Sequence, residues 1–243
     1  MFARPLAALA LAASLAAGAC RAAPEPERPE ERPALGLMTT LPLLWAEAAD
    51  VGELLAADGA AGWVREEIER SHRIEPLDTL EAGALARLDR LVLAQPRALS
   101  PAENVALDAW VRGGGRLLLF ADPMLTRHSR YPVGDRRRPQ DVVLLSPILA
   151  HWGLELRFDD SQSEGERLVE VGGAQVPVNL AGSFALGPGT PCTLTADAVV
   201  ARCRLGEGSV VIVADAAVLD DPDSSDAAER KAALDRLLAL AFD

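Results

Sequence analysis

Short apolar runs separated by amphipathic stretches dominate the middle and the end of the chain. The runs at residues 90–94 (RLVLA), 116–120 (RLLLF) and 209–214 (SVVIVA) are continuously hydrophobic, which is typical of strands buried on both faces. Further apolar runs predict strands at residues 34–45, 72–77 and 154–158, the first of them broken at Pro42. Such strands indicate a parallel sheet covered by helices, and therefore an α/β fold.

The best-defined unit spans residues 90–123. Ser100-Pro101-Ala102-Glu103 has the pattern of a capping box with proline at the first helical position, so a helix is predicted to begin here. Gly113–Gly115 ends that helix. Its apolar face is predicted from helical spacing to contain Ala102, Val105, Ala106, Ala109 and Trp110. Strand, helix and strand with short connections form a βαβ unit, so the two strands are expected to be parallel neighbours.

The other helices and strands are less sharply bounded. Helices are predicted at residues 50–70 with an interruption near Gly59–Gly62, at 81–88, at 142–152 and at 225–242. The last helix has an apolar face of Ala233, Leu234, Leu237, Leu238 and Ala241. Residues 167–180 and 193–205 alternate apolar and polar positions, as antiparallel strands do. We therefore expect one α/β domain over residues 34–243, with an antiparallel β insertion at about residues 160–205.

The first 19 residues have the pattern of an export signal. Arg4 precedes an uninterrupted run of small and apolar residues, 6–17, which is too short to span a membrane. Ala17-Gly18-Ala19 followed by Cys20 resembles the cleavage and lipidation site of a bacterial lipoprotein, although ordinary cleavage after Ala19 and soluble export remain the alternative. Arg21 lacks the acidic character that favours retention in the inner membrane, so the outer membrane is preferred for the lipid-anchored form.

A tether is predicted between this anchor and the folded domain. Residues 24–33 (PEPERPEERP) are too rich in proline and glutamate for a helix interior or a strand, so residues 20–33 are expected to form the lipid-anchor site and an extended spacer. Lipid on Cys20 leaves Cys192 and Cys203, which lie 11 residues apart around an expected hairpin. In an oxidising compartment these two are predicted to form a disulfide, with two buried free thiols as the alternative.

Composition narrows the function mainly by exclusion. Lys and Arg number 24 against 36 Asp and Glu, a net charge of −12, so nucleic acid is excluded as a bulk partner. His72, His128 and His151 are far apart, and the chain has no metal-binding His or Cys spacing, no Gly-x-Ser-x-Gly turn and no phosphate-binding glycine loop. We therefore predict no catalytic residue, no metal ion and no cofactor.

Two acidic residues are candidates for a binding site. Asp122 and Asp215 each follow a buried strand, and the carboxyl edge of a parallel sheet is where α/β proteins usually bind ligands. Such a pair could coordinate a cation or hydrogen-bond a polyol. Alternatively, each carboxylate caps the turn or helix that follows it.

An arginine-rich loop follows Asp122 and is the second candidate. Five arginines within twelve residues form a local positive charge in an acidic protein, and the loop is expected to hang over the same edge of the sheet. Arginine forks could bind a carboxylate, a phosphate, a sulfated glycan or an acidic partner, or they could pair with acids nearby. The candidate binding residues of this loop are Arg127, His128, Arg130, Arg136, Arg137 and Arg138.

The stretch from Leu91 to Pro123 resembles the auxiliary domain of ABC-type transport systems of the gliding-motility GldG type. Members of that group have a similar strand, a "P…LS" turn, a helix ending in glycines and a hydrophobic strand ending in Asp-Pro, and residues 206–215 (GEGSVVIVAD) resemble their glycine turn, strand and terminal aspartate. The resemblance implies a flavodoxin-like fold similar to class I glutamine amidotransferases. Gln95 stands where an amidotransferase needs its cysteine, so that activity is excluded.

These observations leave two functional hypotheses. The first is an exported, non-catalytic accessory protein that binds a ligand or a partner for an envelope ABC-type transport system, held at the periplasmic face by its lipid. Its expected partners are the permease and ATPase of that system or other envelope proteins. The alternative is a periplasmic hydrolase that uses Asp122 or Asp215 as a general base beside His128.

Overall fold

The computed structural model describes residues 32–47, 52, 62–223 and 225–243. The predicted export signal, Cys20, most of the tether and most of the first half of the helix predicted at residues 50–70 lie outside the described residues. Among the described residues, no helix combines the length and the apolar character needed to cross a membrane.

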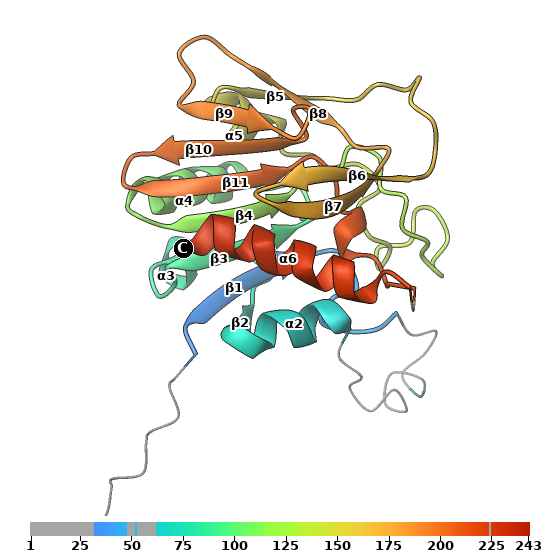
Figure 1. Ribbon diagram of the computed structural model, residues 1–243. Coiled ribbons are helices and arrows are strands. Elements are labelled where there is room, and N and C mark those ends of the chain that lie inside the picture. The colour runs from blue at the N-terminus through green and yellow to red at the C-terminus, as the bar shows by residue number, and fades with distance from the viewer. Residues whose placement is uncertain (1–31, 48–51, 53–61, 224) are drawn as a thin grey trace, which may run out of the picture. The chain divides into compact units, whose positions relative to one another are not determined.

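A seven-stranded sheet forms the centre of the described domain (Figure 1). Its strands lie in the order β2-β1-β3-β4-β11-β10-β9. Their bounds are β1 Ala34–Thr39, β2 Arg73–Pro76, β3 Arg90–Ala94, β4 Arg116–Phe120, β9 Cys192–Thr195, β10 Val200–Leu205 and β11 Gly208–Val213. The five strands from β2 to β11 are parallel, and β10 and β9 extend the sheet in antiparallel fashion. The predicted α/β class with its parallel sheet and antiparallel extension is thus confirmed.

Helices cover both faces of the sheet and bury two separate apolar cores. On one face, α2 (Trp63–Ser71) and α6 (Ala227–Phe242) enclose the first core together with the short η1 (Ala217–Leu219). On the other face, α3 (Ala82–Leu85), α4 (Pro101–Arg112) and α5 (Ser146–His151) enclose the second. Two buried faces explain why the central strands are continuously hydrophobic.

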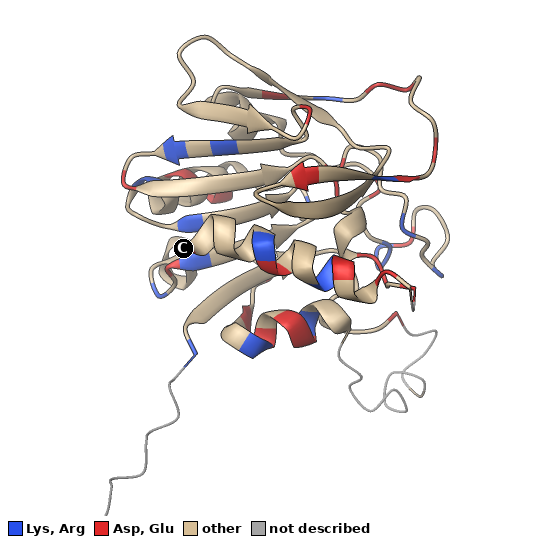
Figure 2. Cartoon of the chain, viewed as in Figure 1, with Lys and Arg blue, Asp and Glu red and all other residues tan. Residues whose placement is uncertain are grey.

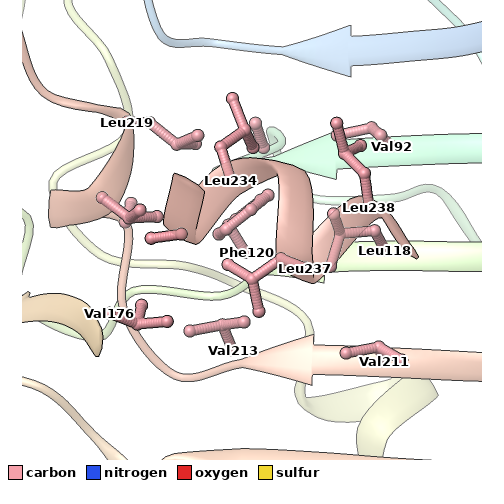
Figure 3. Close-up of a cluster of buried hydrophobic side chains, with 14 of the residues drawn as sticks. Val92, Leu118, Phe120, Val176, Val211, Val213, Leu219, Leu234, Leu237 and Leu238 are labelled. Carbon is pink, nitrogen blue, oxygen red and sulfur yellow. The ribbon is translucent and has the colours of Figure 1, made fainter. Parts of the chain in front are cut away.

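The last helix packs as its sequence pattern predicts. All five residues of its predicted apolar face are buried. Figure 3 shows Leu234, Leu237 and Leu238 of α6 beside side chains of the parallel strands. Leu237 is fully buried and lies in the same core as Phe120 and Val213.

The predicted face of α4 is wrong, although its start is right. The side chain of Ser100 accepts the N–H of Glu103 at 3.2 Å, and Glu103 Oε2 accepts the N–H of Ser100 at 2.8 Å, which completes the capping box. The buried residues, however, are Glu103, Leu107 and Val111, while Val105 is 71% exposed. Glu103 turns inward because it also accepts the N–H of Leu80, and this sets which face of the helix meets the sheet.

Two antiparallel pairs lie outside the main sheet. β5 (Leu154–Arg157) pairs with β8 (Ser183–Leu186), and β6 (Glu166–Val171) pairs with β7 (Ala174–Asn179). β7 packs against α6, so this hairpin closes the first core. In the hairpin formed by β9 and β10, Cys192 lies directly opposite Cys203, and the two residues are joined as a disulfide.

Candidate functional site at the carboxyl edge of the sheet

The parallel strands all end at one edge, and the chain order reverses there. From β1 the sheet continues to β2 on one side and to β3 on the other. Open α/β sheets bind ligands outside the carboxyl ends of their strands at such a switch point. The segments that follow β1, β3, β4 and β11 therefore define the candidate site.

Asp122 follows β4 and is buried, with 1% of its surface exposed. Its Oδ1 accepts the N–H of Met124 at 2.8 Å, and its Oδ2 accepts the N–H of Ala216 at 3.2 Å. The first bond caps the turn after β4, and the second ties that turn to the segment after β11. The carboxylate thus joins the ends of two neighbouring strands.

Asp215 follows β11 and is buried to the same extent. Its Oδ1 accepts the N–H of Ala217 at 2.6 Å, and its Oδ2 accepts the N–H of Asn179, at the end of β7, at 2.9 Å. Burial raises the pKa of Asp122 to about 7. The pKa of Asp215 is raised well above its usual range, mainly by burial and to a lesser extent by the negative charge of Asp122. The two carboxyls thus retain protons at higher pH than ordinary aspartates.

Both aspartates therefore cap turns in the described structure, as in the second of the two alternatives that their sequence positions allowed. Each carboxylate oxygen is engaged by a backbone N–H. Among the described residues, no group of three or more His, Cys, Asp or Glu side chains could hold a metal ion.

Gln95 is a site residue that the sequence analysis did not select. It follows β3, is fully buried and has a φ of +45°, a conformation unusual for a residue with a side chain. Its side chain accepts the N–H of Asp122 at 2.9 Å and donates to the carbonyls of Asp122 at 3.0 Å and Gln140 at 2.8 Å. Thr40 donates to the carbonyl of Gln95, so the ends of β1, β3 and β4 are held together. The only sequence signal was an amide side chain directly after a buried strand.

The arginine-rich loop, residues 125–141, is fastened at its base. The N–H of Leu125 donates to the carbonyl of Asp141 at 2.9 Å, and the N–H of Gln140 donates to Thr40 Oγ1 at 3.1 Å. The loop therefore stands over the carboxyl edge of the sheet, next to β1 and β3.

Most of the loop arginines have partners close by. Arg127 pairs with Asp220 and Asp221, Arg137 with Asp135, and Arg138 with Asp141, while Arg130 donates to the carbonyl of Glu47. The guanidinium of Arg137 also lies over the ring of Tyr131, 4.2 Å from its centre. Arg136 is exposed and has no ion pair within the described part of the chain. Local acids thus neutralise much of the positive charge that the loop carries in the sequence.

A pocket of about 380 Å³ opens beside this loop. Its floor is formed by the ends of β1 and β2, and its walls by residues 40–47 and by Tyr131 and Arg137. Trp45 contributes an indole ring that is 65% exposed, and Glu47 and Asp78 contribute carboxylates. The pocket combines aromatic, hydroxyl and charged groups, as binding sites for polar ligands or peptide segments do.

His128 lies apart from the aspartates. It is exposed and lines a smaller pocket with Arg127, Glu47 and Asp221. In the described residues no hydrogen bond joins His128 to Asp122 or Asp215, and neither aspartate lines that pocket.

The strand order and the helices on both faces define the chain as an α/β protein with a flavodoxin-like parallel sheet. Residues 32–171, more than half of the chain, match the family of auxiliary proteins described as "ABC-type uncharacterized transport system". The chain belongs to this family, which confirms the resemblance noted at residues 91–123. None of the curated protein sequences compared with the chain matches it.

Solved structures are similar in fold alone. An exo-β-1,4-mannosidase from an Opitutaceae bacterium (strain TAV5) has a TM-score of 0.50 and 15% identity, over 88% of this chain and 36% of its own. A cytoplasmic protein of Salmonella typhimurium LT2 has a TM-score of 0.50 and 12% identity, over 86% of this chain and 99% of its own. A ThuA-like protein of Bacteroides uniformis has a TM-score of 0.46 and 12% identity, over 90% and 94%. The chain spans about a third of the length of the glycosidase.

Proposed function

We propose that the protein is an exported, non-catalytic accessory protein that binds a ligand or a partner protein for an envelope ABC-type transport system. Family membership supplies the association with transport. The observation that carries the binding role is the pocket at the carboxyl ends of β1 and β2, where the exposed Trp45 lies beside charged and hydroxyl groups. The partner we expect is the permease and ATPase complex or another envelope protein.

The chemistry of the pocket favours binding over catalysis. Exposed aromatic rings and paired charges supply contact area and orientation for a bound segment. Asp122 and Asp215, whose pKa values are raised, lie beneath the surface and hold backbone N–H groups. A catalytic base must reach a substrate proton, and these carboxylates would first have to release their turns.

The alternative, a periplasmic hydrolase, rests on the raised pKa of Asp122, which at about 7 suits a general acid or base. It requires Asp122 or Asp215 to act with His128. Replacing the aspartates by Asn and His128 by Ala would abolish any hydrolytic activity of the purified protein if this alternative holds. Unchanged activity in all three variants removes it.

Co-purification tests the proposed association. The full chain, carrying an affinity tag after Asp243, is crosslinked in intact cells and isolated from membranes, and the captured subunits are identified by mass spectrometry. We expect permease or ATPase subunits with the wild type and markedly less with Trp45→Ala. The exposed Val105 on α4 provides the matched control, because Val105→Ala should leave capture unchanged. Absence of any transporter or envelope subunit contradicts the proposal.

The location is proposed from the first residues of the chain. Cleavage before Cys20 and lipidation would place the folded domain at the periplasmic face of the envelope, with the outer membrane preferred because Arg21 follows. Cys20→Ala should release the protein from the membrane fraction and abolish labelling by a clickable fatty acid. A membrane-bound, unlabelled wild type would contradict lipidation, and a soluble periplasmic wild type would favour ordinary cleavage.

A further inference from the structure

A row of arginines crosses the opposite, amino end of the sheet. Paired positions place Arg90 beside Arg116, Arg116 beside Ser209, and Ser209 beside Arg204, on β3, β4, β11 and β10. Paired residues of neighbouring strands project from the same face of a sheet, so the three arginines share one face. Arg202 lies on that face as well, because side chains alternate along a strand.

This face is the one that α6 covers only in part. The next row of paired positions on this face begins with Val92, Leu118 and Val211, which Figure 3 shows in the core beneath α6. The same row continues to Arg202 on β10 and to Thr193 on β9. The helix packs on β4, β7 and β11, and β10 lies beyond it towards the sheet edge. Figure 2 shows positive residues on β10 and at the start of β4, near the C-terminal end of α6. The apolar face therefore turns basic where the helix no longer covers it.

A groove of about 480 Å³ lies at this transition. The last residues of α6 form one wall, and the strands form its floor. Of the described residues that line it, Asp243 is the acidic one. Its polar floor consists of Arg116, Arg202 and Arg204 together with the hydroxyl residues Thr193 and Ser209.

The arginines of the groove differ from those of the carboxyl edge in their partners. Arg116 donates to the carbonyl of Phe242 at the end of α6. The side chains of Arg202 and Arg204 are exposed and make no hydrogen bond or ion pair with another described residue. Donors are thus left over in the groove, in a protein whose net charge is −12.

Spacing adds a repulsion that an anion would relieve. Arg202 and Arg204 are two residues apart on one strand, so their backbones are separated by about 7 Å. Their long side chains can therefore reach the same bound anion. The two like charges repel each other, and an anion bound between them would replace this repulsion with attraction. Each guanidinium fork can bind two oxygens of an oxyanion.

We propose that this groove binds a phosphoryl group, carried either by a soluble phosphate compound or by a phospholipid headgroup. Two guanidinium forks and the hydroxyl of Ser209 supply more donors than the two oxygens of a carboxylate need, and they suit a tetrahedral group with three free oxygens. The groove lies at the opposite end of the parallel strands from the pocket beside Trp45, so this proposal stands independently of the accessory function.

The probes are inorganic pyrophosphate, and vesicles of phosphatidylcholine with or without phosphatidylglycerol. Pyrophosphate binding to the purified full chain is measured by titration calorimetry at low salt, and vesicle binding by co-sedimentation. We expect Arg202→Gln combined with Arg204→Gln to weaken binding about tenfold or more. Neither side chain bonds to the fold, so the circular dichroism and melting temperature of this double variant should match the wild type.

A second double variant separates a site from general surface charge. Arg87→Gln combined with Arg167→Gln removes the same charge from two exposed arginines that lie outside the groove. It should change binding less than about twofold. Pyrophosphate binding assigns the site to soluble phosphates, and binding only to phosphatidylglycerol vesicles assigns it to headgroups. Equal losses in both double variants, or no binding of either probe, would overturn the proposal.

Discussion

Replacing Asp122 by Asn should flatten the dependence of the protein's stability on pH. In the folded chain, burial raises the pKa of Asp122 to about 7, whereas its ordinary value is 3.8. Between these values the folded protein binds a proton that the unfolded chain does not. This contribution to stability is fully present below the unfolded pKa and is lost as pH rises through about 7, the reverse of an ion-paired carboxylate.

The size of the pH-dependent contribution to the free energy of unfolding follows from the shift in the pKa of Asp122. The difference between 3.8 and about 7 corresponds to about 4 kcal/mol as an upper bound, at roughly 1.36 kcal/mol per pKa unit. Asparagine removes this contribution, but its amide nitrogen cannot accept the N–H of Met124 or Ala216, and the lost bond costs about 1–3 kcal/mol. The variant should therefore be less stable than the wild type near pH 5 and should approach or exceed it near pH 9.

Urea unfolding of the full chain, followed by circular dichroism at several pH values from about 5 to 9, measures this difference. Asp197→Asn is the control, because Asp197 lies in an exposed turn with a φ of +54°, which asparagine adopts readily. Its free energy of unfolding should follow the wild type. If Asp122→Asn also follows the wild type in parallel across the range, Asp122 does not carry the proton and the account of its burial is wrong.

Three further changes test the packing of the fold. Glu103→Gln should lower the free energy of unfolding by about 2 kcal/mol, measured in urea, because a buried carboxylate with several donors loses an acceptor. Leu237→Ala should cost about 2–5 kcal/mol and lower the melting temperature far more than Leu240→Ala, since Leu237 is fully buried and Leu240 only partly. Cys192→Ser combined with Cys203→Ser should cost about 2–3 kcal/mol under oxidising conditions, and the wild type should fall to the same stability when reduced. Glu103→Gln as stable as the wild type, Leu237→Ala as stable as Leu240→Ala, or the double cysteine variant as stable as the oxidised wild type would contradict the role given to that residue or disulfide.

Local signals predicted the order of elements well. The capping box at Ser100 and the continuous apolar strands report interactions within a few residues, and these survive in the fold. The prediction for the buried face of α4 was wrong because Glu103 lies inward, where its carboxylate accepts hydrogen bonds from the N–H of Leu80 and from Arg97. The spacing of apolar residues along the helix contains no information about these contacts. A buried polar residue can thus rotate a helix away from its most apolar face.

The candidate site was predictable in place but not in detail. Asp122 and Asp215 were found from their positions after buried strands, yet their roles depend on which N–H groups the turns present. Gln95 could not be recognised as a site residue because its side chain bonds to residues 27 and 45 positions away in the chain. The loop arginines lost much of their apparent charge to acids that the fold brings close, such as Asp220 beside Arg127.

The same reasoning explains why the arginine groove was not visible in the sequence. Arg116 is distant along the chain from Arg202 and Arg204, and the pairing of β4, β11 and β10 brings the three together. Charged residues that are adjacent in the sequence can be paired with opposite charges in the fold. A cluster of unpaired charges becomes visible only when the fold shows which residues lack such partners.

Site-specific photocrosslinking from the pocket tests the central claim most directly. A photoreactive amino acid with an aromatic side chain replaces Trp45 in the full chain, so that the pocket keeps a ring, and the same residue replaces the exposed Val105 in a control chain. The account predicts that light joins the Trp45 variant, and not the Val105 variant, to a subunit or to a transported ligand of the ABC-type system. Transporter crosslinks from Val105 alone, or none from Trp45 in cells that assemble the transporter, would contradict it.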